Sequence, residues 1–316
     1  MKRVVNQMTV TVVALLGCTM LATVYFMEAS TSRPMLEERG LRDPDSFMWL
    51  NRATRLHETG DWYDHTNPRI NPPVGHEQHW TRPMDAILLT GGSLLAPALG
   101  FDEGLYVWGL ALSPLMHVAT MLVLLWAALP LVRRRMAPGA TLPIVVLVFA
   151  AQLPIYQSFL LGRPDHQMVL ALLYVTFLGF WIRTLLSEGG KRRSAVGLGI
   201  VAGVATWVSI ESLLFVGLGG IGLGLAWLLG AETAARRNVA AATSFFLTIC
   251  VALAAERGAA GFGLRATDTL SASHVGLAAF VAASALWMWA TERFVDGCAA
   301  GRRVVSILGV AALLAG

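Results

Sequence analysis

Long apolar runs separated by short polar turns fill most of this 316-residue chain, and one long polar segment interrupts them early. A helix needs about 20 apolar residues to cross the core of a bilayer. The pattern therefore predicts an all-α fold, a polytopic transmembrane helical bundle with about eight or nine spanning helices. The expected spans cover residues 8–27, 105–132, 142–161, 168–186, 194–230 (as two helices), 239–255 and 274–290, and a further run starts at 304.

Basic residues set the expected orientation of these spans. Cytoplasmic loops carry an excess of Lys and Arg, which puts Lys2 and Arg3 inside and makes residues 28–85 a long first external loop. We expect an integral protein of the cell (inner) membrane, with a cytoplasmic N-terminus and, in a bacterium, a periplasmic loop. Tyr25 and Phe26 stand where a signal-peptide cleavage site needs small residues, which favours an uncleaved first helix over a signal peptide.

Two apolar runs need a further argument. Residues 86–101 are too few to cross comfortably, so a re-entrant or interfacial piece is expected there. Residues 194–230 can form one long tilted helix or two helices. The basic clusters on the two sides of this second run, at 191–193 and 236–237, both belong inside, so the chain must cross twice between them. Its outer turn is predicted near residues 207–212, which places Glu211 at the outer face.

Composition agrees with a membrane protein and excludes other classes. The chain is 55% apolar and 14% charged, whereas soluble domains carry about a quarter charged residues. Its net charge of +4 is modest and its arginines lie beside apolar runs. Membrane lipids are therefore expected partners and nucleic acid is not. The three cysteines show no CxxC or CxxH spacing, which excludes a disulfide framework and a zinc site.

Ionisable groups gather in the first external loop. Ten of the 20 carboxylates and four of the seven histidines lie in residues 28–85. Three acidic positions are expected at the outer ends of helices: Asp43 with Asp45, Asp165, and Glu211. Carboxylates near a membrane are costly unless they pair or bind something. Oxygen-only ligand sets suit Mg²⁺ or Mn²⁺, and such a cation could hold the phosphate of a lipid-linked substrate. The alternative for the first pair is an ordinary helix N-cap.

The short turn of residues 162–167 combines Arg163, Asp165 and His166 at the start of a helix. A helix N-terminus favours anions, although an exposed turn capped by Asp165 would have the same composition. Further back, Arg82 and Asp85 stand where the first loop re-enters the membrane. Arg82 can pair with Asp85 or with a substrate phosphate.

Two histidines, His76 and His79, precede Arg82 at a spacing that a metal could use, but they lie among prolines and a glycine. A structural loop is the preferred interpretation. The glycines of residues 217–224 follow no strand and precede no Lys-Ser/Thr, so they predict close helix approach rather than a nucleotide loop.

These motifs resemble those of a known family. Asp43-Pro44-Asp45 after the first helix, a long first loop ending in Asp85, and Gly162–Gln167 resemble the GT-C superfamily of membrane glycosyltransferases. The nearest likeness is the catalytic subunit of oligosaccharyltransferase, the Stt3 type, and its bacterial relatives. The turn of residues 162–167 resembles the GxxDHH-like signature of that group, with Gln167 in place of the second His.

The resemblance implies transfer of a sugar or oligosaccharide, with inversion, from a polyprenyl-(pyro)phosphate donor on the outer face, assisted by a divalent cation. It implies that Asp45 or Asp43 activates the acceptor. Asp45, Asp165 and His166 would ligate the metal. The donor phosphate would lie near the four basic side chains His79, Arg82, Arg163 and His166. Asp85 and Glu211 are additional candidates that rest on topology alone.

The resemblance covers roughly residues 5–190, and the soluble C-terminal domain of the family, with its WWDYG motif, is absent from residues 1–316. The last apolar run is too short to span, so the chain is expected to end within an element. The identity of the acceptor stays open between protein, lipid and glycan. Two other functions are weighed against glycosyl transfer: a transporter or flippase with a gated external loop, and an inactive membrane scaffold.

Overall fold

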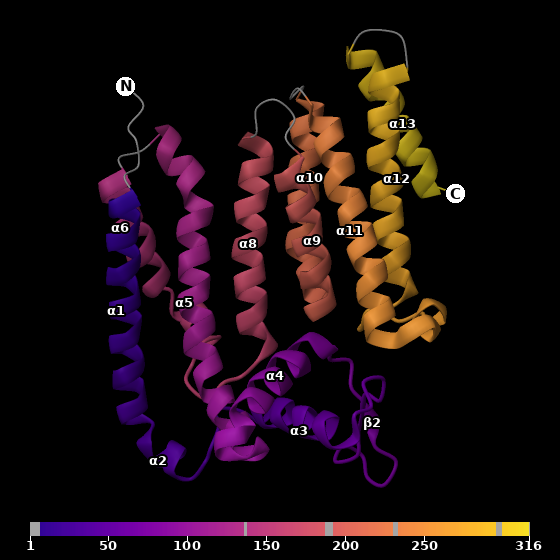
Figure 1. The fold of residues 1–316 in the computed structure, drawn as a ribbon. Coiled ribbons are helices and arrows are strands. Elements are labelled where there is room, and N and C mark those ends of the chain that lie inside the picture. The colour runs from indigo at the N-terminus through magenta and orange to yellow at the C-terminus, as the bar shows by residue number, and fades with distance from the viewer. Residues whose placement is uncertain (1–6, 136–137, 187–191, 230–232, 295–298, 316) are drawn as a thin grey trace. The chain divides into compact units, whose positions relative to one another are not determined.

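The computed structural model describes residues 7–135, 138–186, 192–229, 233–294 and 299–315. This part of the chain is almost entirely helical, which confirms the all-α prediction, and it contains one small antiparallel hairpin that pairs Thr66 with Glu77 and Asn67 with His76. The elements, shown in Figure 1, are α1 (Gln7–Thr31), α2 (Arg33–Glu37), α3 (Pro44–Thr59), β1 (Thr66–Asn67), β2 (His76–Glu77), α4 (Arg82–Leu99), α5 (Phe101–Arg135), α6 (Pro138–Ala150), α7 (Leu153–Gln157), α8 (His166–Leu186), α9 (Arg193–Val208), η1 (Ile210–Ser212), α10 (Leu213–Leu228), α11 (Ala234–Arg257), η2 (Gly258–Gly263), α12 (Ala272–Phe294) and α13 (Ala299–Ala315).

Six helical segments in the described residues are long and apolar enough to cross a membrane: Gln7–Thr31, Phe101–Arg134, His166–Leu186, Ile210–Leu228, Ala234–Gly263 and Ala272–Arg293. Two shorter apolar helices, Gly139–Ala150 and Arg193–Val208, accompany them. Length and composition thus support six spans directly, against the eight or nine expected. The predicted turn inside residues 194–230 is present as η1 between α9 and α10.

The run of residues 142–161 is not one long helix. The chain leaves helical geometry after Ala150, and a five-residue helix, α7, follows. Pro154 stands at the start of α7. Proline removes a backbone donor and disfavours helical geometry in the residue before it. The polar Gln152 and Pro154 mark the break, but a single polar residue among apolar neighbours is compatible with a continuous span, so the hydrophobic pattern did not place it.

Residues 86–101 were expected to form a re-entrant or interfacial piece, and the structure shows that residues 86–99 belong to the regular helix α4. This helix packs closely on α5: a Cβ at Gly91 would overlap the ring of Trp108, whose Nε1 donates to the carbonyl of Ile87 at 3.1 Å. Figure 1 shows α3 and α4 side by side at the end of α5 where the first loop lies.

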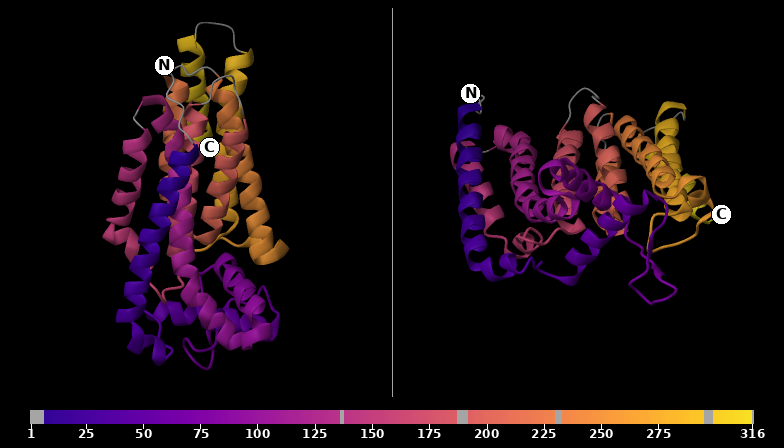
Figure 2. Two further views of the ribbon diagram at one scale, coloured as in Figure 1. Left: turned by 60° about the vertical axis from the view of Figure 1, so that its left-hand side comes forward. Right: turned by 60° about the horizontal axis from the view of Figure 1, so that its bottom comes forward.

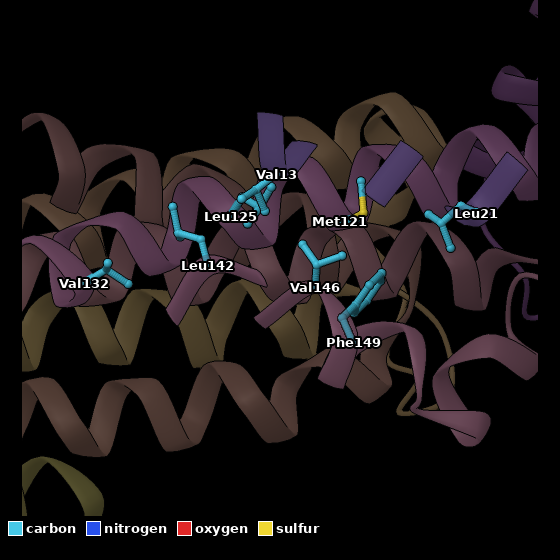
Figure 3. Packing of buried hydrophobic residues seen from close by; sticks show 8 residues of the cluster. All are labelled: Val13, Leu21, Met121, Leu125, Val132, Leu142, Val146 and Phe149. Carbon is cyan, nitrogen blue, oxygen red and sulfur yellow. The ribbon is translucent and has the colours of Figure 1, made fainter. Parts of the chain in front are cut away.

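The chain divides into two compact units, residues 1–179 and 180–316, and each is described by itself. In the first unit α1, α5 and α6 pack together (Figure 2). Their shared core is shown in Figure 3 and consists of Val13, Leu21, Met121, Leu125, Val132, Leu142, Val146 and Phe149. Apolar side chains such as Leu16 and Phe26 remain exposed on α1, as expected for a surface that faces lipid.

In the second unit, α11 packs against both α9 and α12. The close approach of α9 depends on glycine: a Cβ at Gly199 would overlap the carbonyl oxygen of Ala241 and Oγ of Ser244. In contrast, a Cβ added at Gly217, Gly220 or Gly224 of α10 would meet no other atom of the described chain within 4 Å. Within the glycine run of α10, the predicted close contact is made at Gly222, where a Cβ would lie 2.5 Å from Cζ2 of Trp181.

Candidate functional site

Asp43 begins α3 as its N-cap. Its backbone is extended, and its Oδ1 accepts hydrogen bonds from the backbone N–H of Ser46 at 2.8 Å and from Oγ of Ser46 at 2.6 Å. Pro44 follows at the first helical position, where its missing N–H is harmless. Capping thus uses only one oxygen of Asp43, and Oδ2 remains for a second partner.

The turn before α8 is held rigidly against the first loop and α5. The backbone N–H of Arg42 donates to the carbonyl of Gly162 at 2.9 Å, and Oγ of Ser113 donates to the carbonyl of Arg163 at 3.0 Å. Gly162 has a φ of 77°, and a Cβ there would lie 3.2 Å from Cε of Met35. A side chain would therefore be both strained and crowded at this position.

Arg163 joins the two parts of the candidate site. Its Nε donates to Oδ2 of Asp43 at 2.8 Å, although the two residues are 120 positions apart in the sequence. Its Nη2 lies 3.6 Å from Oδ2 of Asp165. The guanidinium also donates to the carbonyl of Gln157 at 2.7 Å and to Oε1 of Gln167 at 3.2 Å. The guanidinium of Arg163 thus contacts both a carboxylate of the first loop, Asp43, and a carboxylate of the later turn, Asp165.

Asp165 is nearly inaccessible, with 2% of its surface exposed. Burial raises its pKa, but the contact with His166, the charges of His166 and Arg163 and the N–H of Trp49 act in the opposite direction, and the pKa of Asp165 ends below its usual value. Nε1 of Trp49 donates to Oδ1 of Asp165 at 3.3 Å. Nδ1 of His166 lies 2.6 Å from the same oxygen, but this contact does not have the geometry of a hydrogen bond. The carboxylate is therefore kept in its charged form.

An aromatic layer borders Asp165. The rings of Trp49 and Trp80 stack at 4.5 Å with an interplanar angle of 13°, and His166 lies 5.8 Å and 6.4 Å from them. Cζ of Arg52 lies over the ring of Trp49 at 5.3 Å. Sequence reasoning missed Trp49. The helical spacing of four residues from Asp45 on α3 is the only signal that could have indicated it.

Asp45 and His79 are accessible. Asp45 lies in the first turn of α3, two residues after Asp43, and its side chain is exposed. His79 is also exposed, and its ring meets Trp80 edge-on at 6.2 Å. His79 is connected to the site through Trp80, whose ring stacks on Trp49 and lies 6.4 Å from the ring of His166.

Arg82 and Asp85 form a buried ion cluster with Arg52. Arg52 binds Asp85 through two bonds of 2.7 Å and 3.1 Å, and Nη1 of Arg82 binds Oδ2 of Asp85 at 2.9 Å. Arg82 also donates to the carbonyls of Trp62 and Asp64. Since Asp85 is 0% and Arg82 3% exposed, the structure places both in the scaffold of the loop. Of the two partners foreseen for Arg82, Asp85 is the one observed.

Glu28, at the end of α1, was not singled out by the sequence. Its Oε1 accepts from Nη2 of Arg42 at 2.9 Å and from the backbone N–H of Leu161 at 3.1 Å, and its Oε2 accepts from the hydroxyl of Tyr156 at 2.8 Å. Glu28 thereby fastens the segment that leads into the turn. The feature of the sequence that could have indicated this role is that Glu28 directly follows an apolar run.

Glu211 belongs to the second unit, where it lies exposed in η1. Nearby in that unit, Glu256 is 0% exposed and accepts from Nε1 of Trp207 at 2.7 Å. The hydrophobic pattern predicts that the span of residues 239–255 ends just before Glu256. In the structure, α11 extends to Arg257 and includes Glu256.

A metal site of the kind expected from the sequence would need several donor side chains close together. Within the described ranges, no three His, Cys, Asp or Glu side chains come together as a complete ligand group. Mg²⁺, however, is commonly bound by only one or two carboxylates, with water and substrate phosphate supplying the rest. In the structure, Asp43 and Asp165 are both paired with Arg163.

Comparisons with protein-family models, with curated proteins and with solved structures found no match. The class of the protein therefore rests on its own features, above all the six helices in the described residues that are long and apolar enough to span a bilayer. The chain has the make-up of an α-helical integral membrane protein.

Proposed function

We propose that this protein is an integral-membrane glycosyltransferase of the GT-C type. It would transfer a sugar or oligosaccharide with inversion from a polyprenyl-(pyro)phosphate donor, on the periplasmic or outer face of the cell membrane. The observation that supports the proposal best is the ion pair between Asp43 and Arg163, with Asp165 beside it. It unites the two acidic motifs on which the family resemblance depends.

In the proposed reaction, an acceptor nucleophile attacks the anomeric carbon of the donor sugar. The bond from that carbon to the phosphate oxygen breaks, and the polyprenyl (pyro)phosphate departs with the bonding electrons. A carboxylate takes the proton of the nucleophile. Asp45 is suited to this role because its side chain is exposed in the first turn of α3, whereas Asp43 is occupied by Ser46 and Arg163.

The remaining residues would bind the donor. Asp43 or Asp45 together with Asp165 and His166 would hold Mg²⁺ or Mn²⁺, which supplies neutralising charge to the leaving phosphate when bound. His79 is accessible for a phosphate contact, as is the partly exposed guanidinium of Arg163. Arg82 would act indirectly, since its donors already serve Asp85 and two backbone carbonyls.

The experiment is a transfer assay on the purified full chain in nanodiscs, with polyprenyl-diphosphate sugar as donor and candidate peptide, lipid and glycan acceptors. Asp45→Asn and Asp165→Asn should each lower turnover by about a hundredfold or more, since general acid–base catalysis contributes about 10² to 10⁴. Glu58→Gln is the matched control, because Glu58 is an exposed carboxylate on the same helix α3. Turnover unchanged in both aspartate variants would refute the proposal.

A transporter or flippase is the second candidate. It is favoured by ionisable groups inside the candidate spans: Glu256 is fully buried, and His117 is 1% exposed and lies 2.9 Å from the hydroxyl of Tyr25. Such groups commonly mark a transport path. Uptake of a lipid-linked sugar or other solute into proteoliposomes, without a covalent product and abolished by Glu256→Gln, would establish it. Absence of both transfer and uptake would favour an inactive scaffold.

A further inference from the structure

Tyr25 and His117 form a buried hydrogen-bonded pair at the segment that leads into the turn of residues 162–167. The hydroxyl of Tyr25, on α1, donates to the carbonyl of Phe159 at 2.8 Å, and its oxygen lies 2.9 Å from Nδ1 of His117 on α5. The ring of His117 also stacks on the ring of Phe159, with 4.5 Å between the centroids and an interplanar angle of 4°. All three side chains are buried, so water does not compete for these contacts.

The donors of the pair define what His117 contributes. Tyr25 has a single hydroxyl hydrogen, and it is used for the carbonyl of Phe159. His117 must therefore donate its Nδ1–H to the oxygen of Tyr25. The other ring nitrogen, Nε2, is buried and has no hydrogen-bond partner among the described residues. The polar role of His117 in the structure is thus confined to Nδ1.

Two further anchors hold the same segment. Oε1 of Glu28 accepts from the N–H of Leu161 at 3.1 Å, and Oγ of Ser113 donates to the carbonyl of Arg163 at 3.0 Å. Ser113 is four residues before His117, so both side chains lie on one face of α5. Helix α5 therefore fixes the segment at both ends, directly at Arg163 and through His117 at its start.

A change at Phe159 would reach the carboxylate of Asp165. Without the hydroxyl, the carbonyl of Phe159 would be a buried acceptor with no donor, which is costly, so it would move toward another partner. The segment would then turn about its remaining anchors. Pro164, whose ring fixes its φ, connects Arg163 to Asp165 and leaves little freedom to absorb such a movement.

We propose, on the basis of the glycosyltransferase function above, that Tyr25 and His117 are positioning residues of the site. Neither needs to touch the donor. Their hydrogen bonds hold the carbonyl of Phe159 and thereby set the places of Arg163 and Asp165, which the proposed reaction uses to bind the donor phosphate. Two side chains of the spanning helices α1 and α5 thus serve a reaction at the ends of these helices.

The test combines steady-state transfer by the full chain in nanodiscs with hydrogen exchange of residues 158–165. Tyr25→Phe keeps the ring and removes the donor. It should lower kcat by about tenfold or more, because a misplacement of about 1 Å can cost about 10²-fold. KM for the donor should change by less than about twofold, since the groups on the turn act mainly on the charge of the departing phosphate. Exchange of the backbone N–H groups in residues 158–165 should become faster.

Thr120→Val is the matched control. Thr120 is also buried, on α5, and its hydroxyl donates to the carbonyl of Met116 at 2.7 Å, within the helix. This variant loses one buried hydroxyl without touching the segment before the turn, so kcat and exchange should stay at the wild-type values. If Thr120→Val lowered kcat as much as Tyr25→Phe, the role of Tyr25 would be structural only and the inference would be overturned.

His117→Asn and His117→Gln separate the two ring nitrogens, and they serve as the test if Tyr25→Phe does not fold. The amide N–H of asparagine can take the place of Nδ1–H, whereas that of glutamine reaches toward the position of Nε2. Asparagine should therefore retain turnover that glutamine loses. Equal loss in both variants, or better retention by glutamine, would contradict a role of His117 through Nδ1.

The failure of the inference and the failure of the proposed function give different results. If Asp45→Asn and Asp165→Asn abolish transfer while Tyr25→Phe alters neither kcat nor exchange, the transferase stands and the positioning role is wrong. If Tyr25→Phe speeds exchange in residues 158–165 and the wild-type chain transfers no sugar, the pair positions the turn for another reaction.

Discussion

Asp85 is a first-loop carboxylate that is buried between two arginine side chains. Its carboxylate is 0% exposed and accepts from both Arg52 and Arg82, which are themselves buried. Asp85→Asn would remove the carboxylate charge that the two buried guanidinium groups share. Breaking a buried pair in this way costs about 3–5 kcal/mol.

We expect Asp85→Asn to lower the free energy of unfolding by that amount, measured by chemical denaturation in detergent with tryptophan fluorescence as readout. Glu58→Gln is the control, and as a surface change it should stay within about 0.5 kcal/mol of wild type. A small effect for Asp85→Asn would mean that the cluster is not a scaffold, and Asp85 would again become a substrate-binding candidate.

Asp64 gives the loop a defined response to acid. The hydrogen bond from Arg55, followed by that from the backbone of Thr66, lowers the pKa of Asp64 to about 2. A carboxylate whose pKa is lower in the folded than in the unfolded chain, where it is about 3.9, contributes its full stabilisation of the fold above about pH 4. That contribution is lost as the pH falls through about 2.

Asp64→Asn should therefore reduce the stability of the loop at pH 7 and flatten its pH dependence between about pH 4 and pH 2. Hydrogen exchange of residues 60–78 as a function of pH measures this. Because other carboxylates titrate in the same range, the difference between wild type and variant is the relevant quantity. Parallel curves would contradict the assignment.

At the scale of elements, α3 depends on Asp43 both for its cap and for its ion pair. The two contributions are separable, since asparagine caps a helix about as well as aspartate and alanine does not. Asp43→Ala should cost about 1 kcal/mol of stability through the cap. Asp43→Asn should retain most of that stability.

Both Asp43 variants remove the charge that faces Arg163, so both should impair transfer in the proposed reaction. Thermal unfolding in detergent and the transfer assay, run on the same preparations, separate the two effects. If Asp43→Asn retained full turnover, the ion pair with Arg163 would have no catalytic consequence, and Asp45 would become the sole first-loop candidate.

Helix positions were largely predictable from the sequence where hydrophobicity decides them. The turn between α9 and α10 follows from the basic clusters on either side, and α8 begins at His166, close to the expected start. The break after Ala150 was not predicted, because its marks, Gln152 and Pro154, are isolated among apolar residues that suit a continuous span. Hydrophobic periodicity reports burial, whereas backbone donors and proline decide where a helix ends.

The contacts within the candidate site could not be predicted from the sequence. The sequence indicated Asp43, Asp165 and Arg163, and the structure brings these three together. It gave no means to tell that Arg163 would bind the two aspartates directly. Such pairing depends on side-chain geometry between segments 120 positions apart, which local patterns do not encode.

At the scale of the molecule, the first loop and the turn before α8 should face the same side of the membrane, and the basic end of α5 the other. Single cysteines at Glu58, Gln167 and Arg133, in a chain whose own cysteines are replaced by serine, test this with a membrane-impermeant maleimide. These three side chains are exposed. We expect labelling of the first two from outside intact cells and of the third only after permeabilisation.

Labelling of positions 58 and 167 from opposite sides would contradict the contact between Asp43 and Arg163. Labelling of both from the cytoplasm would preserve that contact and place the site on the inner face instead. The experiment therefore tests the assembly of the site and its orientation separately.

The bonds made by Glu28 have a consequence for the synthesis of the protein at the ribosome. Glu28 leaves the exit tunnel early, yet its partners Tyr156 and Leu161 follow more than 120 residues later. Until residues 156 and 161 have been synthesised, Glu28 at the end of α1 cannot form these two hydrogen bonds. A nascent chain arrested before position 156 would therefore have its first helix in the bilayer but would lack the contacts that hold α1 to the segment before the turn of residues 162–167.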